Sequence, residues 1–219
     1  MDGPLAQLFI SAFVTLFVVI DPPGCVPIFS SLTAGTSPAH RRSMAIRSSL
    51  IATGVLVAFA LGGEAFLSAL GITLPAFKIA GGIMVFVIAI DMVFEKRTQR
   101  RESRAEEVKS SAAAVGKPLE EEDISVFPMA IPMLAGPGSI ASVMLLSART
   151  GGDLASEVVV LGALLAVLAL TLLSLLAAAP IMKLMGAKFE GALTRLLGVV
   201  LAALAAQFVV DGIKQSFGL

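Results

Sequence analysis

Six long apolar runs constrain this chain more than any other feature of its sequence. The 219 residues are 57% hydrophobic, with a mean hydropathy of +0.93, whereas soluble domains are about 45–50% apolar. A helix needs about 20 apolar residues to cross about 30 Å of hydrocarbon. The runs lie at about 5–32, 48–70, 75–94, 126–148, 155–180 and 191–213. The sequence therefore predicts an all-α membrane protein with six transmembrane helices.

Charged residues collect between the third and fourth runs and predict the topology. Residues 95–123 carry seven Lys or Arg side chains and eight carboxylates, a mixture typical of a solvated linker with helical pieces and unlike a nucleic-acid surface. With both termini outside, thirteen of the sixteen Lys and Arg residues fall on the inner side, as the positive-inside rule requires. We expect a multi-pass inner-membrane protein whose linker, residues 95–125, is cytoplasmic.

The linker separates two halves, 1–94 and 126–219, with three predicted spans each. Because three is odd, two halves of one fold would lie in the membrane with opposite orientation. At an offset of 114, PGCV (23–26) falls on PGSI (137–140), and at an offset of 116, Gly82 falls on Gly198 and Asp91 on Gln207. The sequence thus predicts two inverted-topology three-helix repeats, although single matches are weak and two unrelated halves remain the alternative.

The first apolar run of each half is interrupted by proline and glycine, in IDPPGCVPIF (20–29) and LAGPGSIAS (134–142). Proline lacks a backbone N–H, and glycine frees the backbone, so each motif can break its helix. Unpaired backbone groups within a membrane are tolerated only where protein or a water-filled cavity covers them. A straight helix over 5–32 would also be about 42 Å long, longer than the hydrocarbon core. Each break therefore predicts a site lined by protein.

The chemistry of the two breaks suits a small zwitterionic substrate. Asp21 and Pro22 read as the N-cap and first residue of a half-helix, and the amides of such a helix end attract a carboxylate. Asp21 is a candidate for binding an ammonium group or a coupling cation; capping alone is the alternative. The candidate substrate-binding residues are Asp21, Pro22, Pro23, Gly24, Cys25, Gly136, Pro137, Gly138, Ser139 and Ser142.

Three further polar residues lie within predicted spans. Asp91 and Glu64 are candidates for coupling to a proton or sodium ion, because ionisable groups inside a membrane are usually functional; the alternative is that both reach interfacial water. Gln207 is expected to hydrogen-bond across helices. The only histidine is His40 and the only cysteine is Cys25, so we expect no metal site, no cofactor and no enzymatic activity.

Beyond these arguments, the motifs resemble those of one known family. DPPGCVPIF resembles the DPxGNxPxF motif of the MarC family, also called the SnatA or neutral amino acid transporter family. IPMLAGPGSIAS resembles the repeat counterpart of that motif, and GITLPAFKIAGGIMVFVIAIDMVF and QFVVDGI resemble the third and sixth spans. The matching positions are Asp21, Pro22, Gly24, Pro27 and Phe29, with Gly136, Pro137 and Gly138 in the second half. Cys25 stands where the family usually has asparagine.

The resemblance implies a six-span inner-membrane protein similar to the LysE-type exporters. Some members of the MarC family are described as transporters of small neutral amino acids such as glycine and alanine. We therefore expect a secondary transporter of small neutral amino acids, with the substrate near the midplane between the two broken helices. An exporter of other small solutes or drugs is the alternative. A channel would need a continuous polar path, which the few intramembrane polar residues do not suggest. The exact substrate, the transport direction, the coupling ion and any homo-oligomer are left open.

Overall fold

A computed structural model describes residues 3–114, 123–184 and 187–218, and its helices match the six apolar runs. Within these residues, five helices or continuous helix pairs are long and apolar enough to cross a membrane. A bent pair of helices is a sixth candidate span if its two members are counted together. The predicted all-α membrane class is confirmed. The spans are α1 (Pro4–Ile20) with α2 (Pro22–Leu32), α3 (Pro38–Ala69), α4 (Leu74–Val93), η2 (Ser125–Leu134) with α6 (Pro137–Ala148), α7 (Leu154–Leu176) and the Thr194–Phe217 part of α9 (Ala187–Phe217).

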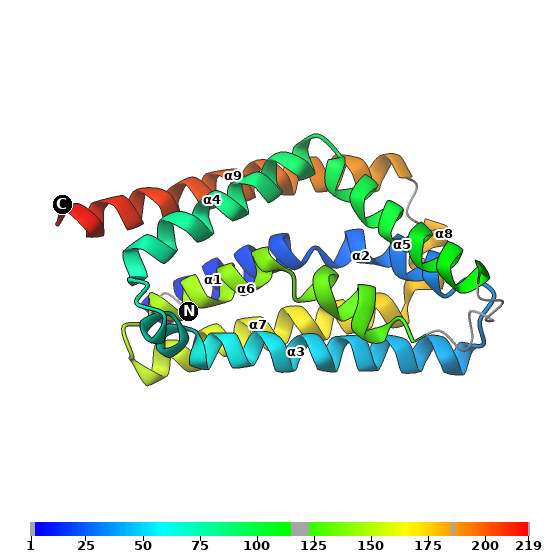
Figure 1. Cartoon of the computed structure of the whole chain (residues 1–219), viewed down its shortest axis with the longest axis horizontal. Helices are drawn as coiled ribbons and strands as arrows, with labels where there is room; N and C mark the ends of the chain where they lie inside the picture. The colour runs from blue at the N-terminus through cyan, green and yellow to red at the C-terminus, as the bar shows by residue number, and fades with distance from the viewer. Residues whose placement is uncertain (1–2, 115–122, 185–186, 219) are drawn as a thin grey trace.

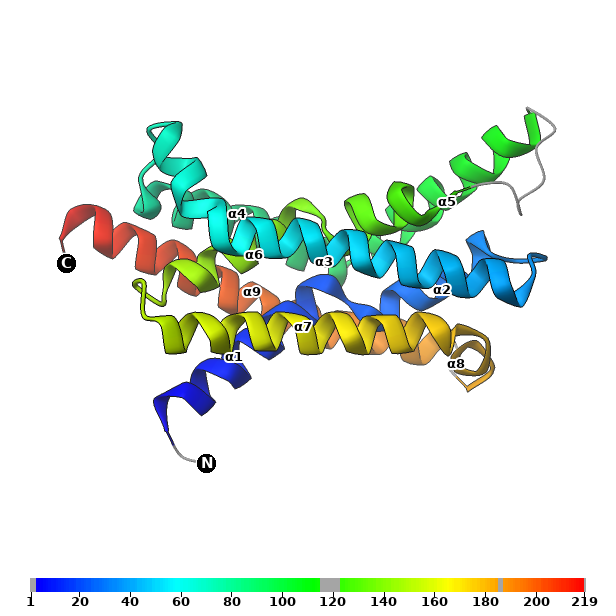
Figure 2. The same ribbon diagram turned by 90° about the horizontal axis from the view of Figure 1, so that it is seen from below.

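Two further helices lie outside these spans. α5 (Lys96–Ala114) occupies most of the predicted linker, and α8 (Ala178–Leu184) follows α7. The helical pieces expected in the linker are therefore present, while its residues 115–122 lie outside the described part of the chain. Figures 1 and 2 show α5 and α8 at one end of the molecule, with both termini at the other end.

The first break is centred on Asp21, which ends α1 and starts α2. Its backbone has φ 60° and ψ 65°, a left-handed conformation that aspartate tolerates better than most residues. The Asp21 N–H donates to the Phe17 carbonyl at 2.9 Å, and the Asp21 carboxylate accepts from the Gly24 N–H at 3.1 Å. One residue thus terminates one helix and caps the next, and Pro22 at the first position of α2 sets the helical φ in advance.

The second break has a different cause. Phe127 and Ile131 have extended backbones inside η2, because each precedes a proline and the proline ring excludes the helical conformation from the residue before it. α6 then starts at Pro137 after a bend of 52° between η2 and α6. Its N-cap is Gly136, which has no side chain to accept from the first amides of the helix. The amides of Gly138 and Ser139 therefore lie at an uncapped helix start.

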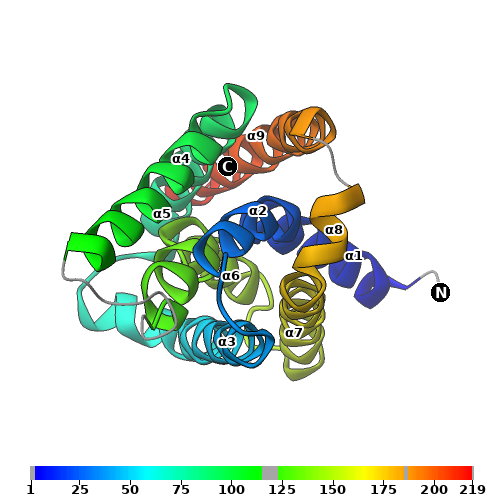
Figure 3. The same cartoon turned by 90° about the vertical axis from the view of Figure 1, so that its right-hand side faces the viewer.

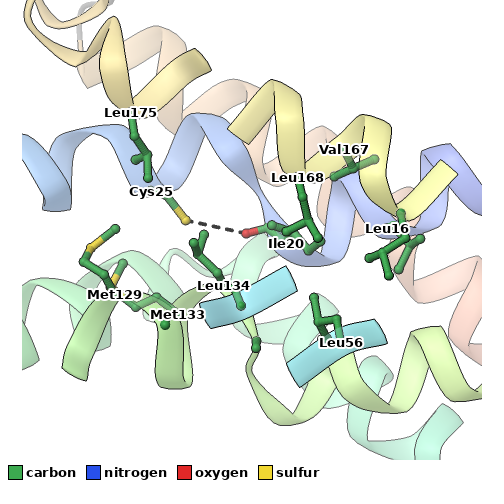
Figure 4. Packing of buried hydrophobic residues seen from close by; sticks show 14 of the residues in the cluster. Leu16, Ile20, Cys25, Leu56, Met129, Met133, Leu134, Val167, Leu168 and Leu175 are labelled. Atoms are coloured by element: carbon green, nitrogen blue, oxygen red, sulfur yellow. Dashed lines mark hydrogen bonds between the residues drawn. The ribbon is translucent and has the colours of Figure 1, made fainter. Parts of the chain in front are cut away.

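The helices form three layers, with the broken helices in the middle one (Figures 1 and 3). α4 and α9 pack along each other on one side, and α3 and α7 lie on the other. In the middle layer, α1 and α2 pack on α7, whereas η2 and α6 pack on α3. The largest apolar cluster joins the middle layer to α3 and α7, and Figure 4 shows part of it, including Leu16, Leu56 and Leu168.

Helices α4 and α9 pack closely because each has a glycine that faces the other helix. A Cβ atom on Gly82 would lie 3.0 Å from the Ala205 carbonyl oxygen and 2.8 Å from the Val209 side chain. A Cβ atom on Gly198 would lie 3.1 Å from the Ala89 carbonyl oxygen and 3.0 Å from the Val93 side chain. Small residues allow this close approach of two backbones in a membrane. The two helices run antiparallel, since Lys78 near the start of α4 donates to Gln215 near the end of α9 at 2.9 Å.

Candidate functional site

A cavity of about 440 Å³ lies where the second break meets α4 and α5. This volume falls in the range of about 300–1,000 Å³ that is usual for small-molecule sites. Its apolar wall consists of Val19, Ile83, Met84, Val87, Ile88, Pro132 and Met133. Its polar wall consists of Gly136, Pro137, Gly138, Ser139, Asp91, Arg97, Arg100, Arg101 and Arg104. The cavity is therefore apolar along α4 and basic along α5.

The second break supplies the start of α6 to this cavity. Gly136, Pro137, Gly138 and Ser139 all line it, so the uncapped amides of the helix start lie at its wall. A helix N-terminus carries a partial positive charge and offers N–H donors to an anion. At Gly138 any larger side chain would run into Ile88. The absence of a side chain there keeps the backbone accessible from the cavity.

The first break contributes through an ion pair with α5. Arg101 Nη1 donates to Asp21 Oδ2 at 2.9 Å, and only 7% of the Arg101 side chain and 3% of the Asp21 side chain are exposed. A second contact, from Arg101 Nη2 to the Ile20 carbonyl at 3.4 Å, uses one of the carbonyls at the end of α1. A Cβ on Gly24 would lie 3.0 Å from Arg101 Nη1 and would also collide with the Asp21 carboxylate. Glycine at this position therefore makes room for the pair.

Arg97, one turn earlier on α5, also reaches the end of α1. Its Nη2 donates to the Val19 carbonyl at 2.5 Å, and its Nη1 lies 3.0 Å from the Met92 sulfur. Burial, and after it the positive charge of Arg101, lowers the pKa of Arg97 to about 10. Arg97 is therefore still charged at neutral pH, and its partners here are neutral atoms.

Asp91 is the only carboxylate in the cavity wall among the described residues, and it is already paired. Arg100 Nη1 donates to Asp91 Oδ2, with the Asp91 side chain 12% exposed and that of Arg100 63% exposed. Four arginines and one carboxylate thus line the same cavity. Within the described residues, Arg97 and Arg104 form no ion pair.

The structure brings most, but not all, of the predicted site residues together. Asp91 and the residues from Gly136 to Ser139 line one cavity, and Asp21 is one ion pair away from it. Pro22, Pro23 and Gly24 form the first turn of α2 behind that pair. Ser142 is buried one turn further along α6, where its hydroxyl has no hydrogen-bond partner among the described residues.

Cys25 lies outside the cavity wall and packs in the apolar cluster. Its side chain is fully buried beside Leu175 and Leu134, and its sulfur lies 3.6 Å from the Ile20 carbonyl (Figure 4). The prediction that Cys25 lines the substrate site is not supported by this position. A cysteine in place of asparagine here changes the packing behind the first break.

Glu64 and Gln207 also lie away from the cavity. Glu64 is exposed near the end of α3 and lines a separate hollow of about 330 Å³ with residues such as Ser68 and Gly71. Gln207 is exposed and donates to Asp211, one turn further along the same helix, at 2.7 Å. Among the described residues, the hydrogen bond of the Gln207 side chain therefore stays within α9. In the part of the chain that the structure describes, no three His, Cys, Asp or Glu side chains gather where they could hold a metal ion.

The arginines of α5 are the residues that sequence reasoning missed. The linker was expected to be solvated, yet Arg101 and Ala105 are buried. A signal was present in the spacing, because positions 97, 100, 101 and 104 recur at intervals of three and four and so share one face of a helix. Mixed charge hid this stripe, since Glu102 lies between its members in the sequence and Glu106 and Glu107 follow soon after it.

Comparisons with known proteins agree with this architecture. The chain is 37% identical over 208 residues to the UPF0056 membrane protein MJ1677 of Methanocaldococcus jannaschii, which covers 95% of this chain and 97% of the relative. It is 37% identical over 206 residues to the UPF0056 inner membrane protein YhgN of Escherichia coli, covering 94% and 96% of the two chains. It is 36% identical over 211 residues to YvbG of Bacillus subtilis, covering 96% of each chain.

No solved structure matches the fold at a significant level. The model of a family described as "MarC family integral membrane protein" matches residues 6–217, which is nearly the whole chain. The described helices, the two breaks and the full-length likeness to these membrane proteins lead to one conclusion: the chain belongs to the MarC family of integral membrane proteins.

Proposed function

We propose that the protein is a secondary transporter of small neutral amino acids such as glycine and alanine. The observation that carries this proposal is the 440 Å³ cavity at the second break, which Val19 of α1 also lines and which has a helix N-terminus in its wall. Figure 1 places both breaks near the middle of the long axis of the molecule. Broken helices that meet at a central cavity are the usual way in which transporters bind a polar solute inside the membrane.

The groups at the cavity can hold the carboxylate of an amino acid. That carboxylate would accept hydrogen bonds from the first amides of α6 and from the arginines of α5, whose charge-assisted bonds are stronger than neutral ones. Asp91 is the residue placed to attract the ammonium group. The short side chain of glycine or alanine would lie against the apolar wall formed by α4. Asp91 and Asp21 remain our candidates for coupling to a proton or sodium ion.

Alternating access would come from two inverted three-helix repeats, and two features of the packing support this. The first helix of each half packs on the second helix of the other half, α1 on α7 and α6 on α3. The glycine contacts of α4 and α9 are equivalent in the two halves: Gly82 meets Ala205 and Val209, and Gly198 meets Ala89 and Val93. Adding 116 to the numbers 82, 89 and 93 gives 198, 205 and 209, so each contact has a counterpart in the other half. A two-fold relation between the halves would produce these contacts.

An exporter of other small solutes or drugs is the second candidate. The apolar wall along α4, with Ile83, Val87 and Ile88, is the observation that favours it, since such a wall accommodates solutes larger and less polar than alanine. The two candidates share one architecture, so transport measurements with different solutes separate them.

Uptake and counterflow of labelled glycine and alanine into proteoliposomes test the proposal. We expect saturable flux, which Gly138→Leu abolishes because the new side chain fills the cavity beside Ile88. Gly162→Leu is the matched control, since a Cβ on Gly162 of α7 meets nothing within 4 Å. The absence of saturable flux for every small neutral amino acid would refute the substrate class.

A further inference from the structure

Two arginines of α5 lack a charge partner although they lie at a largely apolar cavity. Asp21 is paired with Arg101 and Asp91 with Arg100, so the one carboxylate that the described residues place in the cavity wall, Asp91, is not free for Arg97 or Arg104. Arg97 is half-buried and is bonded only to a carbonyl and a sulfur. The cavity wall therefore has an excess of positive charge.

For the half-buried Arg97, this excess has a physical cost that an anion would remove. Taking a charged group out of water costs several kcal/mol unless an opposite charge compensates it. Here the start of α6 adds its own partial positive charge to the same wall, since Gly136 does not cap the helix. Two independent features, the unpaired arginines and the helix N-terminus, thus attract the same kind of ligand group.

The remaining wall indicates what else the ligand carries. Beside the arginines, α4 contributes the aliphatic side chains of Ile83, Val87 and Ile88 to the cavity wall. A ligand that fills this cavity has an anionic head toward α5 and α6 and a short apolar part toward α4. A carboxylate fits the head well, because the planar guanidinium group binds it through two parallel hydrogen bonds.

We propose that Arg97 and Arg104, with the start of α6, form a carboxylate subsite, and that the site takes small monocarboxylates with a short apolar chain. This inference rests on the transport function proposed above and widens its substrate class, since small neutral amino acids are one kind of monocarboxylate. The ammonium group adds less to affinity than the carboxylate does, because Asp91 would be shared between that group and Arg100. Carboxylates that lack an amine are therefore ligands of the same site.

Equilibrium binding to the purified protein in nanodiscs tests this inference directly. The labelled probe is propionate, and the competitors are alanine and alaninamide, which lacks the carboxylate. We expect saturable propionate binding that alanine displaces and alaninamide does not. We also expect Arg97→Gln and Arg104→Gln each to weaken propionate binding at least tenfold.

Arg104 keeps the test independent of folding, because its side chain is exposed and forms no ion pair with a described residue. Lys96→Gln is the matched control on the same helix, since Lys96 is exposed and lies outside the cavity wall. This control is expected to bind propionate as the unchanged protein does. Equal binding by Arg104→Gln, Arg97→Gln and Lys96→Gln would overturn the subsite.

The transport proposal and the subsite fail in different ways. Alanine flux without any propionate binding would overturn the carboxylate subsite and leave the amino acid transporter standing. Propionate binding that depends on Arg97 and Arg104, without flux of any amino acid, would support the subsite and refute the proposed transport of amino acids.

Discussion

At the scale of single residues, Asp21 has three roles that depend on one another. Its left-handed backbone ends α1, its carboxylate caps α2 through the Gly24 amide, and the same carboxylate neutralises Arg101. The capping role that the sequence predicted is present, and the binding of an ammonium group or coupling cation stays a prediction. The charge partner is an arginine of the chain itself, which ties the first break to α5.

Asp21→Asn keeps the cap but removes the buried ion pair between Asp21 and Arg101. We expect the free energy of unfolding in detergent to fall by about 3 kcal/mol, because removing one member of a buried ion pair is strongly destabilising. Arg101→Gln is expected to cost a similar amount, and the double variant less than the sum of the two. Arg47→Gln breaks the half-exposed pair with Asp123 and should cost under about 1 kcal/mol. Additive losses would contradict the pairing.

At the scale of helices, α4 and α9 form an antiparallel pair held by close backbone approach. Gly82 and Gly198 are placed so that each meets an alanine carbonyl and a valine side chain of the other helix. Neither contact can relax by moving a flexible side chain alone, because in each case a backbone oxygen lies near the added atom. The pair is therefore sensitive to any increase in size at either glycine.

Gly82→Val and Gly198→Val are expected to destabilise the protein to a similar extent, by about 1–3 kcal/mol each, because overpacking forces the two helices apart. Gly162→Val provides the control on α7, where an added Cβ meets no other atom within 4 Å. Thermal unfolding in detergent measures all three. If one glycine tolerates valine and the other does not, the mirrored packing of α4 and α9 is not what holds the pair.

At the scale of the whole molecule, charge and topology agree on the two ends. The loop before α3, the helices α5 and α8 and most of the basic residues lie at one end, and both termini and the loops before α4 and α7 lie at the other (Figures 1 and 2). The positive-inside rule then predicts which end faces the cytoplasm. The arginine-lined cavity would lie beneath α5 on the cytoplasmic side.

Cysteine labelling in whole cells checks this orientation, and the single native cysteine makes it simple. Starting from Cys25→Ser, Leu154→Cys should react with a membrane-impermeant maleimide in intact cells, because Leu154 is 78% exposed near the predicted outer end. Ser103→Cys on the exposed face of α5 should react only after permeabilisation. The reverse pattern would place α5 outside and overturn the predicted topology.

The sequence by itself determined the membrane class, the positions of the spans and the places where helices break. These depend on the length of apolar runs and on the backbone limits of proline and glycine, which are local properties. Asp21, Gly136 and Gly138 were predicted for the same reason. The tertiary structure alone decided which charged residues meet these breaks. Arg97 and Arg101 lie 76 or more residues from the first break in the sequence, and only the packing of α5 against α2 and α4 brings them to it. Likewise, Cys25 is adjacent to the first break in sequence, but helix geometry turns its side chain toward Leu175 and away from the cavity.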